Sequence, residues 1–210
     1  IILDLFKMNM KVIAISQRIE KSKYNEIRCQ LDIRLIDFIV KCGLVPTPIP
    51  YFSETKKNSN YHLKKWIESH NLGGIVLSGG SDMGENRIRD NSEKYLLKYS
   101  LKNNTPVIGI CRGMQMIGKF FGIKLKKVKG HVNKDHFVYS LKDKVKVNSY
   151  HNYSIKTCPI NFKILYKTLD GNIEAIISKN KRIYGCMWHP ERNRIFNEKD
   201  VKIFKTIFRK

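Results

Sequence analysis

One cysteine of this 210-residue chain has the surroundings of a catalytic nucleophile. Cys111 lies in Gly109-Ile-Cys-Arg-Gly113, the thiol version of the G-x-S-x-G sequence in which a strand turns directly into a helix. The two glycines leave room for such a tight turn. The turn sets the sulfur over a helix N-terminus, where unpaired N–H groups favour a thiolate. The alternative to a catalytic Cys111 is a buried and inert cysteine in the same kind of turn.

A histidine and a carboxylate that could activate this thiol follow the last expected strand. His189 and Glu191 stand two apart in Met187-Trp-His-Pro-Glu-Arg192, so an extended backbone would direct both to one face. Pro190 favours an extended conformation for His189. We predict that His189 is the general base and that Glu191 orients it. A lone His beside a Glu is more often surface chemistry, but the cysteine turn in the same chain favours catalysis.

A third stretch supplies backbone donors. Ser78-Gly-Gly-Ser-Asp82 follows another expected strand, and paired glycines let N–H groups point at a ligand. The N–H groups of Gly80 and Arg112 could form an oxyanion hole for an acyl intermediate. In open α/β sheets, ligands bind outside the carboxyl ends of the strands, which is where all three stretches fall.

The elements that must position these residues follow an alternating pattern. Short apolar runs alternate with helical segments in the first two thirds of the chain, which predicts an α/β, flavodoxin-like, mostly parallel sheet with helices on both faces. The expected strands are 11–16, 44–49, 74–77 and 106–110, and the expected helices are 25–41, 61–70, 91–102 and 114–121. The prolines at 46 and 48 place the second strand near an edge.

Beyond residue 128 the pattern changes to short strands separated by turns, which predicts an antiparallel C-terminal region. The expected strands there are 144–148, 162–168, 173–178 and 182–188, with a closing helix over 198–210. We find no repeat or linker. We therefore expect a single domain over 11–210, with residues 1–10 as a leader or start-site extension.

The composition of the chain limits the classes of binding partner that we expect. The formal net charge is +22, yet the lysines are scattered and no zinc finger, aromatic RNA-binding signature or basic-region helix is present, so we do not expect nucleic acid to be a partner. No apolar run reaches the ~18 residues that span a bilayer, so we expect no membrane partner. Five cysteines without C-x-x-C favour a reducing cytoplasm, with Cys29, Cys42, Cys158 and Cys186 as packing residues. We expect no metal and no cofactor.

The three stretches together resemble the class I glutamine amidotransferase superfamily, in its γ-glutamyl hydrolase branch. The resemblance runs from about Lys11 to the C-terminus and implies the fold of that superfamily. It implies a catalytic triad of Cys111, His189 and Glu191, with oxyanion-hole N–H groups from Gly80 and Arg112. It also implies a pocket for the glutamyl α-amino and α-carboxylate groups, lined by Gln115, Asn148, Ser149, Tyr150 and His151.

Within that branch, Ser16-Gln-Arg-Ile19 and the segment after Tyr24 are similar to enzymes that hydrolyse γ-glutamyl-CDP-amidate in capsule phosphoramidate synthesis. That substrate is anionic, so Arg residues should gather at the pocket mouth. The candidates are Arg18, Arg28, Arg34, Arg87 and Arg112, with ion pairs to nearby carboxylates as the alternative. Hydrolysis of γ-glutamyl-γ-aminobutyrate, a glutaminase subunit delivering ammonia to a synthase, and a non-catalytic binder stay open, as does a homodimer.

Overall fold

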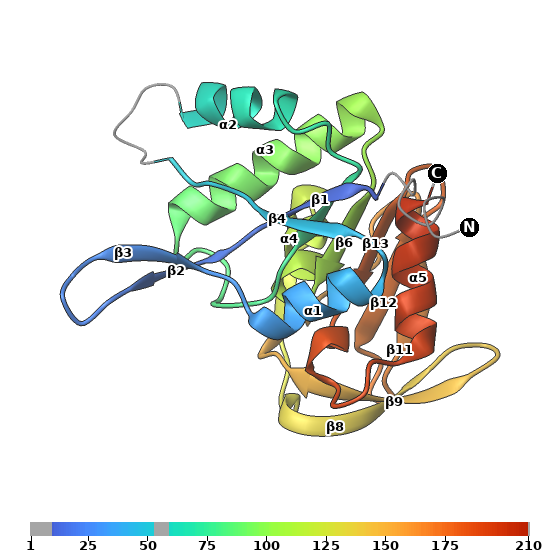
Figure 1. The fold of residues 1–210 in the computed structure, drawn as a ribbon. Coiled ribbons are helices and arrows are strands. Elements are labelled where there is room, and N and C mark those ends of the chain that lie inside the picture. The colour runs from blue at the N-terminus through green and yellow to red at the C-terminus, as the bar shows by residue number, and fades with distance from the viewer. Residues whose placement is uncertain (1–9, 53–58, 210) are drawn as a thin grey trace.

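The computed structural model describes residues 10–52 and 59–209. Within them, nine strands form one mixed sheet in the order β4-β1-β5-β6-β13-β12-β11-β8-β9 (Figure 1). Its first five strands are parallel neighbours: β4 (Val45–Pro48), β1 (Val12–Ile15), β5 (Gly74–Leu77), β6 (Val107–Ile110) and β13 (Ile183–Cys186). The others pair antiparallel: β12 (Ile173–Ser178), β11 (Phe162–Lys167), β8 (Val132–Tyr139) and β9 (Lys144–Tyr150). The expected α/β fold, with a parallel core and antiparallel C-terminal strands, is confirmed.

Alternate residues of the central strands face two separate cores, so both faces of the sheet are covered. Ile13 and Ile15 of β1 pack with α1 (Ile33–Lys41) and α5 (Glu198–Phe208). Ala14, between them, belongs to the core formed with α2 (Ser59–Glu68), α3 (Arg87–Asn103) and α4 (Arg112–Phe120). Strands buried on both faces are typical of parallel sheets, and they present only their ends to solvent. A site in this half must therefore lie at the strand ends.

One expected helix is wrong in its first part. The segment predicted as a helix over 25–41 instead forms β3 (Ile27–Gln30), which pairs antiparallel with β2 (Arg18–Lys21). Ile27, which lies within the expected helix, is exposed. The helix begins only after Asp32, whose side chain accepts a hydrogen bond from the N–H of Arg34. The Asp32 cap therefore fixes the start of the helix. The prediction placed the start too early because apolar residues before Asp32 happened to recur at a helical spacing.

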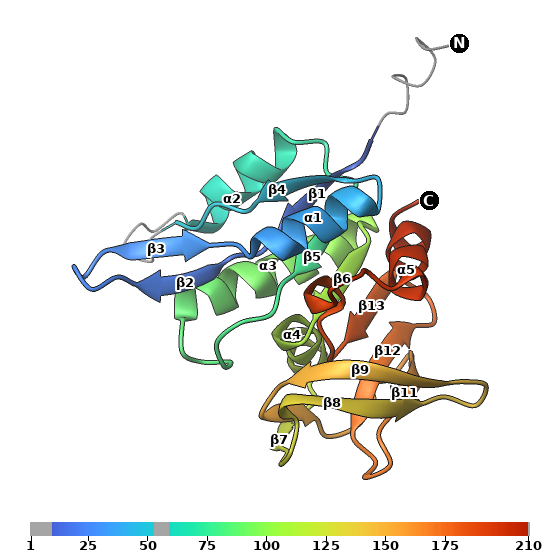
Figure 2. The same ribbon diagram turned by 60° about the horizontal axis from the view of Figure 1, so that its bottom comes forward.

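In the C-terminal region, β9 covers the strand expected at 144–148, whereas its hairpin partner β8 was not predicted. β8 and β9 form a long hairpin that crosses the end of the sheet (Figure 2). Only Lys167 and Tyr139 pair across its junction with β11. A further small sheet joins β7 (Leu125–Lys127) to β10 (Tyr153–Ile155). The expected edge position of β4 is confirmed, whereas most of the expected leader, 1–10, lies outside the described residues. Among the described helices, none has the length and apolar character needed to cross a membrane.

Candidate active site

The sequence around Cys111 folds as a strand–turn–helix. β6 ends at Ile110 and α4 begins at Arg112, so Cys111 alone makes the turn, with φ 50° and ψ −105°. This positive φ is strained for a residue with a side chain. A Cβ atom on Gly113 would lie 2.0 Å from the carbonyl oxygen of Leu77, and one on Gly109 would lie 2.5 Å from the carbonyl carbon of Gly113. The room that these glycines were expected to provide is therefore required by close backbone contacts.

His189 follows β13, the parallel neighbour of β6, and so reaches the same sheet edge as Cys111. Its Nδ1 atom lies 2.6 Å from Oε1 of Glu191, and both side chains are buried. The backbone is extended at His189 but forms a 3₁₀ turn over Pro190–Arg192, so the expectation of an extended segment is wrong beyond His189. The predicted contact forms all the same, because the turn brings Glu191 back under the ring.

The electrostatics of His189 fit a thiolate–imidazolium pair. Burial alone would lower the pKa of His189. The charge of Cys111, a hydrogen bond with Cys111 and the interaction with Glu191 outweigh burial and raise that pKa to about 9. His189 therefore interacts with both Cys111 and Glu191 and lies between them. At neutral pH the imidazole holds a proton that it can give to a leaving group.

The glycine turn after β5 lies against the same histidine. A Cβ atom on Gly79 would come within 2.5 Å of Cε1 of His189, so only glycine fits there. Gly80 has φ +142° and neighbours the Arg18 and Arg89 side chains. Arg112 is the first residue of α4, where N–H groups lack helical partners. These positions are compatible with the predicted oxyanion hole.

A buried ion network beneath the two turns was not predicted. We call Arg89, Asp90, Glu93 and Arg112 the paired cluster. Arg112 binds Asp90 and Glu93, while Nε of Arg89 donates to Glu93 at 2.9 Å. Burial would raise the pKa of Glu93, but Arg89 and Arg112 lower it.

The paired cluster holds the glycine turn. Nη2 of Arg89 donates to the carbonyl oxygens of Ser78, at 2.8 Å, and Gly79, at 3.0 Å. Because Arg112 is 2% exposed and paired, the expectation that its side chain meets a phosphate at the pocket mouth is wrong. An Arg and a Glu four apart on α3 were the only available sequence signal for this network.

Asn148 of β9 holds the backbone of His189. Its Oδ1 accepts from the N–H of His189 at 2.9 Å, and its Nδ2 donates to the carbonyl oxygen of His189 at 2.8 Å. The same Nδ2 lies 3.1 Å from Oδ1 of Asn193. The ring of Tyr150 packs edge-on to the His189 ring, with centroids 5.7 Å apart. The structure thus gives Asn148 a positioning contact, while its assignment to substrate stays a prediction.

The other expected pocket residues have partners of their own. Nε2 of Gln115 donates to the carbonyl oxygen of Tyr153 at 2.9 Å, and Oγ of Ser149 donates to that of His131 at 2.6 Å. The His151 ring is buried beside Glu174. Arg18 lies beside Gly80, so it is the candidate arginine nearest the glycine turn. The roles of Gln115, Ser149, Tyr150, His151 and Arg18 toward substrate stay predictions.

The remaining arginines and cysteines also have defined places. Arg34 donates to the carbonyl oxygen of Asn193 at 2.7 Å, and exposed Arg28 pairs with Glu26. Arg28 therefore has the ion pair that was the alternative to phosphate, whereas Arg34 binds backbone carbonyl groups instead. Of the cysteines expected to be packing residues, Cys42 and Cys186 are buried and Cys158 is half-buried. Cys29 is exposed, so that expectation is wrong for it.

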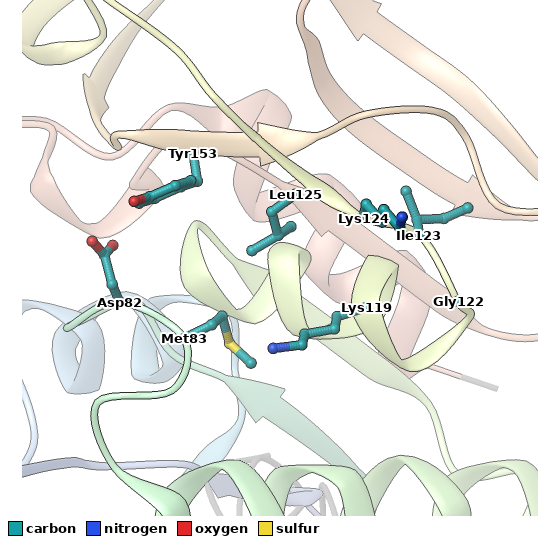
Figure 3. A pocket seen from close by; sticks show the side chains of 8 residues that line it. All are labelled: Asp82, Met83, Lys119, Gly122, Ile123, Lys124, Leu125 and Tyr153. Carbon is teal, nitrogen blue, oxygen red and sulfur yellow. The ribbon is translucent and has the colours of Figure 1, made fainter.

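A cavity of about 560 Å³ runs beside α4 (Figure 3). Asp82 and Met83 line it from the loop after the glycine turn, and Tyr153 lines it from β10. Lys119 and Lys124 add positive charge. No triad residue lines this cavity. It adjoins the site through Tyr153, whose carbonyl oxygen binds Gln115 one turn after Cys111.

Comparisons with known proteins agree with this geometry. Residues 30–210 match the family described as glutamine amidotransferase class-I. The γ-glutamyl-CDP-amidate hydrolase of Campylobacter jejuni is 33% identical over 168 residues, covering 77% of this chain and 78% of that protein. A glutamine-hydrolysing GMP synthase subunit of Pyrococcus abyssi is 35% identical over 134 residues, covering 60% and 69%.

Among solved structures, a Thermoplasma acidophilum protein described as a GMP synthase subunit superposes with a TM-score of 0.70 at 22% identity. The alignment covers 95% of this chain and 93% of that one. At this identity the likeness shows the fold. The family match, which spans most of the chain, shows more: this protein belongs to the class I glutamine amidotransferase family.

Proposed function

We propose that this protein hydrolyses γ-glutamyl-CDP-amidate, with Cys111 as nucleophile, His189 as proton carrier and Glu191 as its orienter. Hydrolysis of a γ-glutamyl amide is the chemistry of the family. The observation that carries the residue assignment is the raised pKa of His189 between Cys111 and Glu191 at one sheet edge. The similarity to the Campylobacter jejuni enzyme supports the nucleotide substrate.

The reaction then follows from these positions. The Cys111 thiolate attacks the γ-carbonyl carbon, and the oxyanion is held by the N–H groups of Gly80 and Arg112. His189 gives its proton to the leaving nitrogen as the C–N bond breaks, which leaves a γ-glutamyl thioester. Neutral His189 next takes a proton from water, whose oxygen attacks the thioester. Glutamate leaves, and the thiolate–imidazolium pair is restored.

The cavity beside α4 is our proposed place for the anionic leaving group. Its size falls within the ~300–1,000 Å³ usual for small-molecule sites. Lys119 and Lys124 would meet the phosphates, in place of the predicted Arg112. This placement refines the expectation of basic residues at the pocket mouth.

The test compares kcat/KM for γ-glutamyl-CDP-amidate, glutamine and γ-glutamyl-γ-aminobutyrate. We expect the nucleotide substrate to be preferred, and Cys111→Ala to abolish turnover while exposed Cys29→Ala retains it. Lys119→Ala combined with Lys124→Ala should raise KM for the nucleotide substrate only, whereas Lys98→Ala, an exposed lysine of α3, should not. Equal kcat/KM values for all three substrates would reject the nucleotide assignment and leave the hydrolase standing.

A role as the glutaminase component of a synthase is the second candidate, favoured by the similarity to the Pyrococcus abyssi GMP synthase subunit. Such a component would pass ammonia to its synthase partner. Glutamine turnover by the isolated chain that is negligible alone and rises with a partner would support this candidate. Efficient turnover of the nucleotide substrate without any partner would argue against it.

A further inference from the structure

Three histidines meet a buried glutamate where the β8–β9 hairpin crosses β12. We call His131, His136, His151 and Glu174 the histidine cluster. Nδ1 of His131 and Nε2 of His151 lie 3.5 Å and 3.4 Å from Oε1 of Glu174, and Nε2 of His136 lies 3.4 Å from Oε2. His136 lies on β8 and Glu174 on β12, while His131 precedes β8 and His151 follows β9. Three histidines from the two arms of the hairpin therefore converge on one carboxylate of β12.

These polar atoms are buried without hydrogen-bond partners. Glu174 is 0% exposed, His151 3% and His131 5%. Among the described residues, neither carboxylate oxygen of Glu174 has a hydrogen bond, and neither do the three ring nitrogens that face it. The separations of 3.4–3.5 Å are too long for good hydrogen bonds. Buried polar atoms in this state are costly, so something other than a protein group should satisfy them.

The ring nitrogens of His131 and His151 that point away from Glu174 indicate which kind of group would satisfy the cluster. Nδ1 of His151 lies 3.1 Å from the carbonyl oxygen of Tyr153, which can only accept a proton. A neutral His151 therefore carries its hydrogen on Nδ1 and turns the lone pair of Nε2 toward Glu174. Nε2 of His131 lies 3.4 Å from both a carboxylate oxygen of Asp170 and the side-chain amide nitrogen of Asn172, while its Nδ1 faces Glu174. A ring lone pair that faces a carboxylate repels it unless a proton or a metal cation lies between them.

The spacing suits a metal ion. Bonds of about 2.0–2.1 Å in a tetrahedron separate neighbouring ligand atoms by about 3.4 Å, which matches the separations of 3.4–3.5 Å between the histidine nitrogens and the oxygens of Glu174. One ligand atom from each of His131, His151 and Glu174 can be chosen so that all lie within 4.8 Å of one another. Asp170 and the Tyr153 carbonyl stand where outer-shell partners of metal-bound histidines stand.

We propose that His131, His151 and Glu174 bind a divalent transition-metal ion of the Zn²⁺ class, with His136 as the adjacent fourth ligand. Imidazole and carboxylate ligands suit Zn²⁺. This proposed site is separate from Cys111, His189 and Glu191, and it replaces the expectation of no metal with a testable one. It joins the hairpin to β12, which matters because one residue pair links β8 to β11 in the described sheet.

The proposed site also reaches the pocket. The Tyr153 carbonyl oxygen that binds His151 accepts from Gln115 as well. The Ser149 hydroxyl donates to the carbonyl oxygen of His131. A metal at the histidine cluster would thus fix two segments expected to bind the glutamyl group.

The test measures metal content and affinity of the whole chain. Purified protein should contain about one Zn²⁺ per chain by mass spectrometry of the metals, or take up one in calorimetry after chelation. Co²⁺ in its place should give the visible spectrum of a four-coordinate site with nitrogen and oxygen ligands. Asp170→Asn should weaken Zn²⁺ binding by roughly 10–100-fold, the usual cost of an outer-shell loss. Glu174→Gln and His151→Ala should weaken it further.

Two controls locate the ion. His62→Ala, an exposed histidine of α2, and Cys111→Ala should both keep full binding. Binding that is lost in Cys111→Ala and kept in Glu174→Gln would place the ion at the triad and overturn the proposal. Absence of Zn²⁺ and Co²⁺ uptake by the wild-type chain would do the same, with proton sharing within the cluster as the explanation. The wild-type spectrum decides the matter even if a ligand variant fails to fold.

Discussion

The paired cluster and the histidine cluster are both buried and charged, but they are balanced differently. In the paired cluster, two arginines meet two carboxylates, and each carboxylate has a guanidinium partner. In the histidine cluster, three imidazole rings, which can be neutral, surround one carboxylate at distances too long for good hydrogen bonds. The first arrangement pairs every charge within the protein, although Nη1 of Arg89 and Nε of Arg112 lack partners among the described residues, and it can serve as scaffold. The second is complete only with a cation, which is why we assign it a ligand.

Removing a charge from the paired cluster should have the largest effect on stability. Glu93→Ala leaves Arg89 and Arg112 buried with too little compensating charge, which typically costs about 3–5 kcal/mol. We expect a loss of that size in the free energy of unfolding, measured by urea denaturation at fixed pH. A loss below about 1 kcal/mol would show that the paired cluster is not a self-contained scaffold.

The His189–Glu191 pair is intermediate between the clusters, because one oxygen of Glu191 is bonded and Oε2 has no partner among the described residues. The pKa of His189, raised from 6.5 to about 9, means that the protonated ring stabilises the fold. This contribution is full below about pH 6.5 and disappears as the pH rises through about 9.

Nuclear magnetic resonance titration of the His189 ring would measure that pKa directly. Both Cys111→Ser and Glu191→Gln should lower it, since Cys111 and Glu191 each raise it in the wild type. An unchanged pKa in both variants would separate His189 from its supposed partners.

Asn148 offers a smaller effect that reports on position. Asn148→Ala leaves the N–H and carbonyl groups of His189 without these partners, at a cost of about 1–3 kcal/mol. We expect kcat to fall while KM for the substrate changes little, because the histidine loses its placement and the pocket is kept. A change confined to KM would instead make Asn148 a substrate-binding residue, as the family resemblance implies. Asn103→Ala, at the exposed end of α3, is the matched control.

The exposed ion pairs of Glu68 should give the smallest loss in the free energy of unfolding. Glu68 lies 3.6 Å from Lys64 and 3.5 Å from Lys65, and all three side chains are exposed. Glu68→Ala should cost less than about 1 kcal/mol, because solvent screens the pair. If this loss equalled that of Glu93→Ala, burial would not be the source of the difference between the two sites.

The sequence allowed the parallel half to be predicted well, because short apolar strands, helix stops and glycines carry local signals. β5 matches its predicted bounds, and the glycines around Cys111 do what their positions suggested. The C-terminal half was harder, although β12 also matches its predicted bounds. Glu174 is far in sequence from His131 and His136, and only the crossing of β8 over β12 brings them together. The positioning contact of Asn148 likewise depends on tertiary structure that no local pattern encodes.

The hairpin's narrow attachment has a kinetic consequence. The hairpin backbone pairs with the sheet at one residue pair and is otherwise held by side chains such as Val138 and Val147, so we expect it to open locally without unfolding the parallel half. Asn148 lies on that hairpin and hydrogen-bonds to both the N–H and the carbonyl oxygen of His189. Each opening would therefore release the histidine, so hydrogen exchange of β9 amides and the lifetime of the assembled triad should share one rate.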